Sequence, residues 1–143
     1  MTERKRELAR RWLIKAQPWP EQGERHDLAT ARRLSKEPEP YLDTAIYHCQ
    51  QAAEKTLKGF LVFHDQAFEK THDIEVLLGM AASYHEKFSH WLEIGERLTD
   101  YATAFRYPDV VMEPTRAEFE QALENAENIY AFVLSVLPPE VRP

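Results

Sequence analysis

Eight polar residues have the types and spacing to bind a phosphate-bearing ligand. They fall in three short segments, which are Gln51, Lys55 and Lys58; His72 and Asp73; and Arg106, Tyr107 and Asp109. Lysine and arginine side chains bind phosphate, a tyrosine ring stacks on a base, and amide or carboxylate groups hydrogen-bond a base edge. Residues spaced four and three apart share a stripe on a helix, and backbone N–H groups at a helix start receive anions. The pattern therefore predicts a nucleotide-binding pocket if the fold brings the three segments together.

The same residue types also serve purely structural roles. In that alternative, Arg106 pairs with Asp109 or Asp73 to hold a turn, Asp73 caps a helix, and the stripe of Gln51, Lys55 and Lys58 faces solvent. Both interpretations remain open from the residues alone.

Other kinds of site find little support. Glu69 and His72 form a single Glu-x-x-His without a second copy, and Glu86, His90 and Glu93 fit the exposed face of a charged helix, so we expect no metal site. The four glycines are not clustered, which excludes the Walker and Rossmann fingerprints, and no cofactor is expected. Cys49 lies among apolar positions, as a small core residue would.

The elements that must position the polar residues are helices. Prolines and glycines divide the chain into stretches of helical period, and no stretch alternates as a strand would. The sequence predicts an all-α, antiparallel up-and-down bundle of about five helices, with a four-helix core plus short helices. The predicted helices are 2–16, 27–35, a central helix 41–63, a short helix that Thr71 caps with Asp73 in its first turn, 86–105, and a last helix that begins with a capping box at Thr115 and runs to 137.

Apolar spacing also predicts which large side chains are buried. Leu8, Trp12, Leu13 and Ala16 share one side of the first helix, and a stripe of aromatic residues on helix 86–105 is expected in the core. That stripe consists of Phe88, Trp91, Tyr101 and Phe105. Trp12, Trp19 and Tyr107 are the better candidates for a partner surface, because Trp and Tyr are enriched at binding hot spots.

Length and charge predict the number of domains and the region where an anionic partner would bind. A chain of 143 residues with 43% hydrophobic and 29% charged residues is expected to form one domain over 1–143. Its net charge of −6 divides into +5 for residues 1–36 and −11 for the remainder, so an anionic partner would dock near the N-terminal segment unless that segment packs on acidic neighbours or on a second copy. The sequence shows no apolar signal segment and a single cysteine, which predicts a cytoplasmic protein without membrane contact.

Three motifs, in order along the chain, resemble the HEPN family of small helical domains. They are the run His48 to Lys58 on the central helix, Thr71-His72-Asp73-Ile74 with Leu77-Leu78, and the run Tyr101 to Asp109 that ends in Arg106-Tyr107-Pro108-Asp109. The resemblance covers about 27–137. It leaves 1–26 as a basic N-terminal helix and a Pro/Trp loop, and the role of 17–26 is not assigned.

The resemblance implies a nucleotide or RNA ligand, a homodimer, and a small nucleotidyltransferase as protein partner in a toxin–antitoxin type of system. Ribonucleases of this family resemble one another in an Arg followed after four to six residues by His, and that spacing is absent after every Arg of this chain. We therefore assign no catalytic residue and favour a binding module. Two alternatives stay open, namely a metal-independent endoribonuclease toxin that uses His72 and Arg106, and a structural partner protein that binds no ligand.

Overall fold

Six α-helices and two 3-10 helices make up most of the computed structural model, which describes residues 2–18, 26–109 and 113–143. Those residues contain no strand, so the predicted all-α class is confirmed. None of the described helices is long and apolar enough to span a bilayer. The elements in order are α1 (Glu3–Ala16), α2 (Asp27–Leu34), α3 (Leu42–Phe63), α4 (Ile74–Ala82), η1 (Glu86–Trp91), α5 (Leu92–Arg106), α6 (Arg116–Val136) and η2 (Pro139–Val141).

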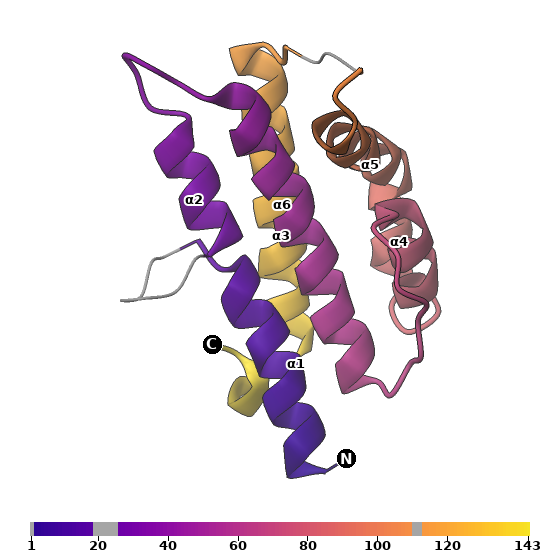
Figure 1. The fold of residues 1–143 in the computed structure, drawn as a ribbon. Coiled ribbons are helices and arrows are strands. Elements are labelled where there is room, and N and C mark those ends of the chain that lie inside the picture. Colours follow the sequence, from indigo (N-terminus) through magenta and orange to yellow (C-terminus); the bar gives the residue numbers. More distant parts are fainter. Residues whose placement is uncertain (1, 19–25, 110–112) are drawn as a thin grey trace.

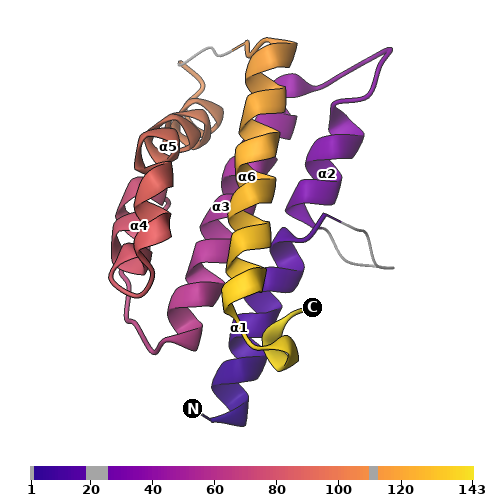
Figure 2. The same ribbon diagram turned by 180° about the vertical axis from the view of Figure 1, so that it is seen from behind.

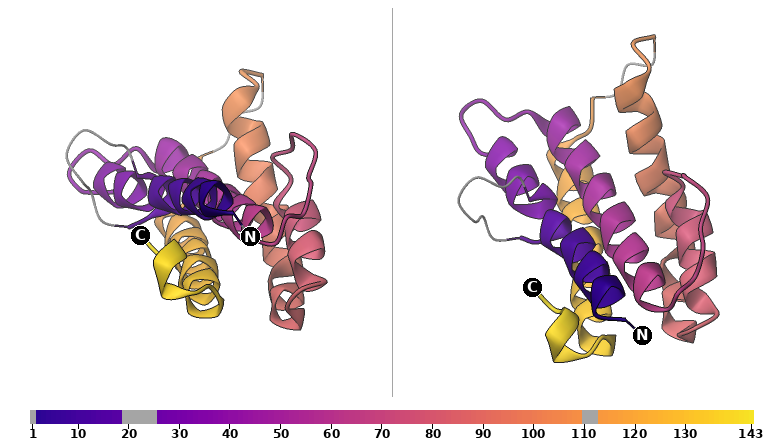
Figure 3. Two further views of the ribbon diagram at one scale, coloured as in Figure 1. Left: turned by 90° about the horizontal axis from the view of Figure 1, so that it is seen from below. Right: turned by 60° about the horizontal axis from the view of Figure 1, so that its bottom comes forward.

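The long helix α3 lies at the centre and contacts all five other α-helices. On one side of it α1 and α2 follow each other end to end, and on the other side lie α4 and α5 (Figure 1). Helix α6 packs on the face of α3 that points away from the viewer in Figure 1, as the view from behind shows (Figure 2). Seen from below, the short C-terminal η2 lies beside α1 (Figure 3). Helix α1 runs antiparallel to α3 as predicted, whereas α6 runs parallel to it (Figures 1 and 2).

Side chains near the helix ends explain most of the boundaries. Thr115 and Glu118 form the predicted capping box of α6. Helix α4 is capped by Asp73, whose carboxylate accepts from the Val76 N–H, so the prediction that Thr71 is the cap is wrong. The Thr71 hydroxyl instead accepts from the N–H of Asp73, the capping residue itself.

The predicted continuous helix 86–105 is divided into η1 and α5. Trp91, with φ −102° and ψ 4°, marks the change from 3-10 to α geometry. The Ser89 hydroxyl donates to the Glu86 carbonyl, and Phe88 is inserted into the core between Phe60 and Phe132, with ring centroids 4.8 and 5.0 Å away. Tertiary packing of Phe88 and a local side-chain bond thus override the helical period in this segment.

The core is built mostly from α3 and the helices around it. Cys49, Ala52 and Ala53 are fully buried, as expected for small residues that allow close helix approach. Burial also raises the pKa of the Cys49 thiol, which keeps it protonated and unreactive. Leu8 is 48% exposed, so its predicted place on the apolar side of the first helix is wrong. Ala9 takes that place, one residue further along α1.

Gly59 lies where α1 packs tightly on α3. A Cβ atom there would lie 3.1 Å from both the Ala9 carbonyl oxygen and the Trp12 Cβ, and 3.2 Å from the Leu13 Cγ. We expect Gly59→Ala to lower the free energy of unfolding by about 1–2 kcal/mol, because α1 must move away as a body. Gly79 on α4 is the matched control, since nothing lies within 4 Å of a Cβ there. Gly79→Ala should raise stability by up to about 1 kcal/mol through helix propensity.

Chemical denaturation of both variants measures the difference directly. Equal stabilisation by the two substitutions would show that α1 is not seated against α3 at this distance.

Candidate ligand-binding site

Four residues of α3 form a polar stripe on the face that lies between the α1/α2 side and the α4/α5 side. They are Tyr47, Gln51, Glu54 and Lys58, spaced four, three and four apart. Glu54 and Lys58 are only 4% and 5% exposed, which is rare for charged residues unless they are paired. Two of the eight predicted residues, Gln51 and Lys58, thus belong to one stripe, and the alternative in which Lys58 is merely solvated is wrong.

Glu54 is the hub of this stripe. Its carboxylate accepts from the Lys58 ammonium at 3.2 Å, from His72 Nδ1 at 2.8 Å and from the Gln50 amide at 3.2 Å. The Gln50 amide also donates to the His72 carbonyl at 3.0 Å, and Gln51 donates to Gln50 at 2.7 Å. Predicted residues Gln51, Lys58 and His72 are therefore joined in one hydrogen-bonded network.

Aromatic rings complete the surroundings of the Lys58 ammonium. It lies 5.6 Å from the Trp12 ring centroid and 5.7 Å from that of Phe68. Such contacts stabilise a cation that is shielded from water. Trp12, a candidate for a partner surface, is half-buried and packs against Lys58 instead. Trp19, the other tryptophan singled out for that role, lies outside the described residues.

Asp27 at the start of α2 forms a second buried polar group. It is 5% exposed, and its two carboxylate oxygens accept from His48 Nδ1 at 2.8 Å and from the Lys55 ammonium at 2.7 Å. Predicted residue Lys55 is thus held by a carboxylate across the α2–α3 contact. Because Nδ1 donates to Asp27, the Nε2 atom of the partly exposed His48 is left to face other partners.

The end of α5 brings Arg106 against α3. The Tyr47 and Phe105 rings stack with centroids 4.1 Å apart and nearly parallel planes, and the Arg106 guanidinium lies 6.0 Å from the Tyr47 centroid. Among residues 2–18, 26–109 and 113–143, Arg106 makes no ion pair, so the expected pairing with Asp73 or Asp109 is absent there. Phe105 is 47% exposed, and its predicted place in the core is wrong.

Three predicted residues make no described contact with these groups. Tyr107 ends α5 and is 57% exposed, Asp109 is exposed two residues later, and Asp73 is engaged as the cap of α4. The candidate site therefore has three parts along α3. They are the Glu54 network, in which Glu54 binds Lys58, His72 and Gln50; the Asp27 pair, in which Asp27 binds His48 and Lys55; and the Arg106 stack of Tyr47, Phe105 and Arg106. Tyr47 of the Arg106 stack neighbours His48, which is bound to Asp27, with ring centroids 5.7 Å apart, so it connects the last two parts.

Comparison with known families decides what kind of domain this is. A model of the HEPN domain matches residues 16–136, which is most of the chain. The chain belongs to the HEPN domain family. This confirms the resemblance seen in the three motifs, and it places the chain among modules related to nucleotides and nucleic acids. No curated protein and no solved structure matches the chain.

The HEPN match begins at the last residue of α1 and ends at the last residue of α6. The polar face of α3, the Asp27 pair and the Arg106 stack all lie inside the matched segment. Helix α1 lies outside it except for Ala16, although α1 packs closely on α3 and contributes Trp12 to the surroundings of Lys58.

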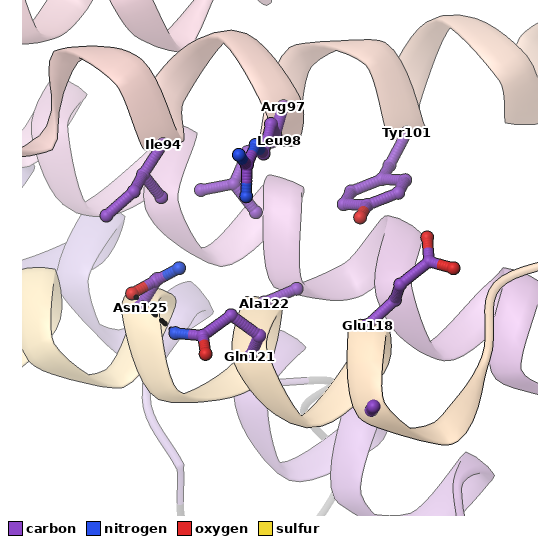
Figure 4. Close-up of a pocket in the computed structure, with 9 residues that line it drawn as sticks. Ile94, Arg97, Leu98, Tyr101, Glu118, Gln121, Ala122 and Asn125 are labelled. Carbon is purple, nitrogen blue, oxygen red and sulfur yellow. Dashed lines mark hydrogen bonds between the residues drawn. The ribbon is translucent and has the colours of Figure 1, made fainter.

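A separate pocket of about 260 Å³ lies between α5 and α6 of the HEPN domain, away from all eight predicted residues. Figure 4 shows Tyr101 and Glu118 at one end and Ile94 and Asn125 at the other, with Leu98 and Ala122 on the walls. Burial raises the pKa of the Tyr101 hydroxyl, which stays protonated. Most of the lining is apolar and carries no cluster of cations, so it does not fit the phosphate-bearing ligand that the sequence predicts.

The sequence analysis does not predict the two buried carboxylates at the centre of this candidate site, Asp27 and Glu54. In the sequence, Asp27 has the position of an ordinary acidic residue in the first turn of a helix, and Glu54 lies beside the stripe of Gln51, Lys55 and Lys58 without belonging to it. Only the fold shows that both carboxylates are buried against lysines. The spacing of Tyr47, Gln51, Glu54 and Lys58 was the available signal, since it repeats every three or four residues.

Proposed function

We propose that this chain is a HEPN binding module that takes a nucleotide-containing ligand at the Arg106 end of the polar face. The observation that carries the proposal is the exposed guanidinium of Arg106, seated over Tyr47 and next to the exposed rings of Phe105 and Tyr107. A guanidinium binds phosphate through two parallel hydrogen bonds, and aromatic rings stack on bases. No other predicted cation is equally available, because Lys55 and Lys58 are each bound to a carboxylate.

In this proposal some of the remaining polar residues contact the ligand and others hold the helices together. Gln51, one turn from Tyr47, and the Nε2 atom of His48 are placed to hydrogen-bond a base or ribose. Lys55, Lys58, His72 and Asp73 keep α3, α2 and the start of α4 in register, and their direct contact with ligand stays a prediction. Tyr107 and Asp109 extend the binding surface beyond the end of α5.

The proposal includes a homodimer and a small nucleotidyltransferase as partner, in a toxin–antitoxin type of system. HEPN domains often dimerise or bind nucleic acid, which supports the class of assembly. Light scattering tests the first part, and we expect a mass of about twice 16.8 kDa. A monomer at micromolar concentration would remove every model that builds the site from two copies.

Titration with each of the four nucleoside triphosphates tests ligand binding itself. We expect at least one to bind in the absence of metal, with the affinity depending on Arg106. The missing Arg-to-His spacing favours binding over RNA cleavage, and RNA incubated with the protein in EDTA should stay intact. Cleavage under those conditions would support the ribonuclease alternative instead.

A further inference from the structure

Helix α1 is an unusually basic element in an acidic protein. Its fourteen residues carry six cations and two carboxylates, a net charge of +4, whereas the whole chain has −6. Almost all of α1 lies outside the segment that matches the HEPN domain, so its charge is not explained by the family site. The question is what the basic face of this helix contacts.

The cations of α1 that point away from the core form a row. Ala9, Leu13 and Ala16 are buried against the rest of the fold, and Arg4, Arg11 and Lys15 lie on the opposite, exposed side. Their offsets of seven and four residues align them along the axis, about 10 Å and then about 6 Å apart. A hollow of about 310 Å³ lies between the first two cations of this row and is lined by Arg4, Glu7, Leu8 and Arg11.

The fold uses little of this positive charge internally. Lys5 pairs with Asp65 beyond the end of α3. Arg11 pairs with Glu7 one turn earlier at 3.3 Å, but the two side chains are 70% and 48% exposed, and such a pair contributes little stability. Arg4 and Lys15 make no ion pair with any residue that the structure describes. Packing on acidic neighbours within the fold therefore accounts for Lys5 and not for the row.

We propose that the row Arg4, Arg11 and Lys15 binds the phosphodiester backbone of a single-stranded polynucleotide. The row extends for about 16 Å along the helix axis, which exceeds the size of one phosphate group and suits a chain of phosphates better. A polyanion also exchanges readily with the weak Glu7–Arg11 pair. The proposal takes its ligand class from the proposed function and places a second contact region on α1, beyond Arg106.

Two other anionic partners fit the geometry less well. A membrane surface requires an apolar helix face to insert, and that face of α1 is buried in the fold with only Leu8 exposed beside the cations. An acidic polypeptide would gain most from apolar anchors in a groove, and Leu8 is the only exposed large apolar side chain of α1.

The test compares two triple variants of the full chain. In the first, Arg4, Arg11 and Lys15 are changed to Gln. In the matched control, Arg33, Arg97 and Lys70, which are also exposed, are changed to Gln. Binding of a twelve-residue oligouridylate is measured by fluorescence anisotropy between 50 and 200 mM salt, and thermal melting verifies that both variants fold. Polyglutamate of equal charge and phosphatidylserine vesicles serve as competitors.

We expect the first variant to lose about tenfold or more in oligouridylate affinity, with a salt slope shallower by about two, while the control stays within about twofold of the wild type. Equal losses in the two variants would overturn the proposal in favour of diffuse charge. Absence of oligouridylate binding by the wild type would overturn it too, as would competition by polyglutamate or vesicles at the same charge concentration. Nucleoside triphosphate binding should be unchanged in the first variant. Nucleoside triphosphate titration therefore tests the Arg106 site, and oligouridylate binding separately tests the row on α1.

Discussion

Glu54→Gln is expected to lower the free energy of unfolding by about 3 kcal/mol and the melting temperature by about 10 °C at neutral pH. Glutamine keeps the size, and its amide oxygen can still accept from Gln50 and His72, but its N–H2 group cannot accept from the Lys58 ammonium, so the loss reports the charge together with its hydrogen bond to Lys58. The Lys58 ammonium, 5% exposed and 3.2 Å from the Glu54 carboxylate, is then left as a buried cation without its counter-charge. Contacts with the Trp12 and Phe68 rings recover only part of that cost.

A second substitution separates the charge from the packing. In the double variant Glu54→Gln with Lys58→Met, the unpaired cation is gone and a flexible apolar side chain fills the same space, so most of the lost stability should return. Glu124→Gln on the exposed face of α6 is the matched control and should change the melting temperature by no more than about 2 °C. If the double variant melts below the single one, or if Glu54→Gln behaves like the control, the pair is not buried as described here.

The overall fold is largely predictable from the sequence because its signals are local. Helical period, prolines and the Thr115 capping box define both ends of four of the six α-helices, namely α1, α2, α3 and α6, to within one or two residues. The errors arise where a distant residue decides the conformation. Phe88 is drawn into the core beside Phe60 and Phe132, which divides the predicted helix 86–105, and Phe105 leaves the predicted core stripe to stack on Tyr47.

The candidate site is less predictable, because spacing along one helix does not show what lies across from it. Lys55 and Lys58 have the pattern of a phosphate-binding stripe, yet each faces a carboxylate, one from α2 and one from the preceding turn of α3. Glu54 and Lys58 were close enough in sequence to be recognised as an i, i+4 pair. The contact between Asp27 and Lys55 spans 28 residues and depends on how α2 docks, which local pattern does not determine.

Arg106→Ala is expected to weaken nucleoside triphosphate binding by roughly 10- to 100-fold, the equivalent of losing charged hydrogen bonds worth about 1.5–3 kcal/mol. The guanidinium lies on the exposed edge of the Tyr47–Phe105 stack and makes no ion pair among the described residues, so its charge is free to bind phosphate. For the same reason, stability should change little, with a melting temperature within about 2 °C of the wild type. Isothermal titration and thermal melting on the same samples measure both quantities.

Two further variants determine which property of Arg106 matters. Arg106→Lys keeps the charge but loses the planar fork of the guanidinium that lies over the Tyr47 ring, so an affinity between those of the wild type and Arg106→Ala is expected. Arg97→Ala removes an equally exposed arginine from the same helix, on the side that faces the α5–α6 pocket, and should leave the affinity within about twofold. If Arg106→Ala binds as the wild type does but melts several degrees lower, Arg106 holds the end of α5 in place and does not belong to the ligand site. If Arg97→Ala loses as much affinity as Arg106→Ala, the ligand responds to the general charge of α5 and the Arg106 stack is not its site.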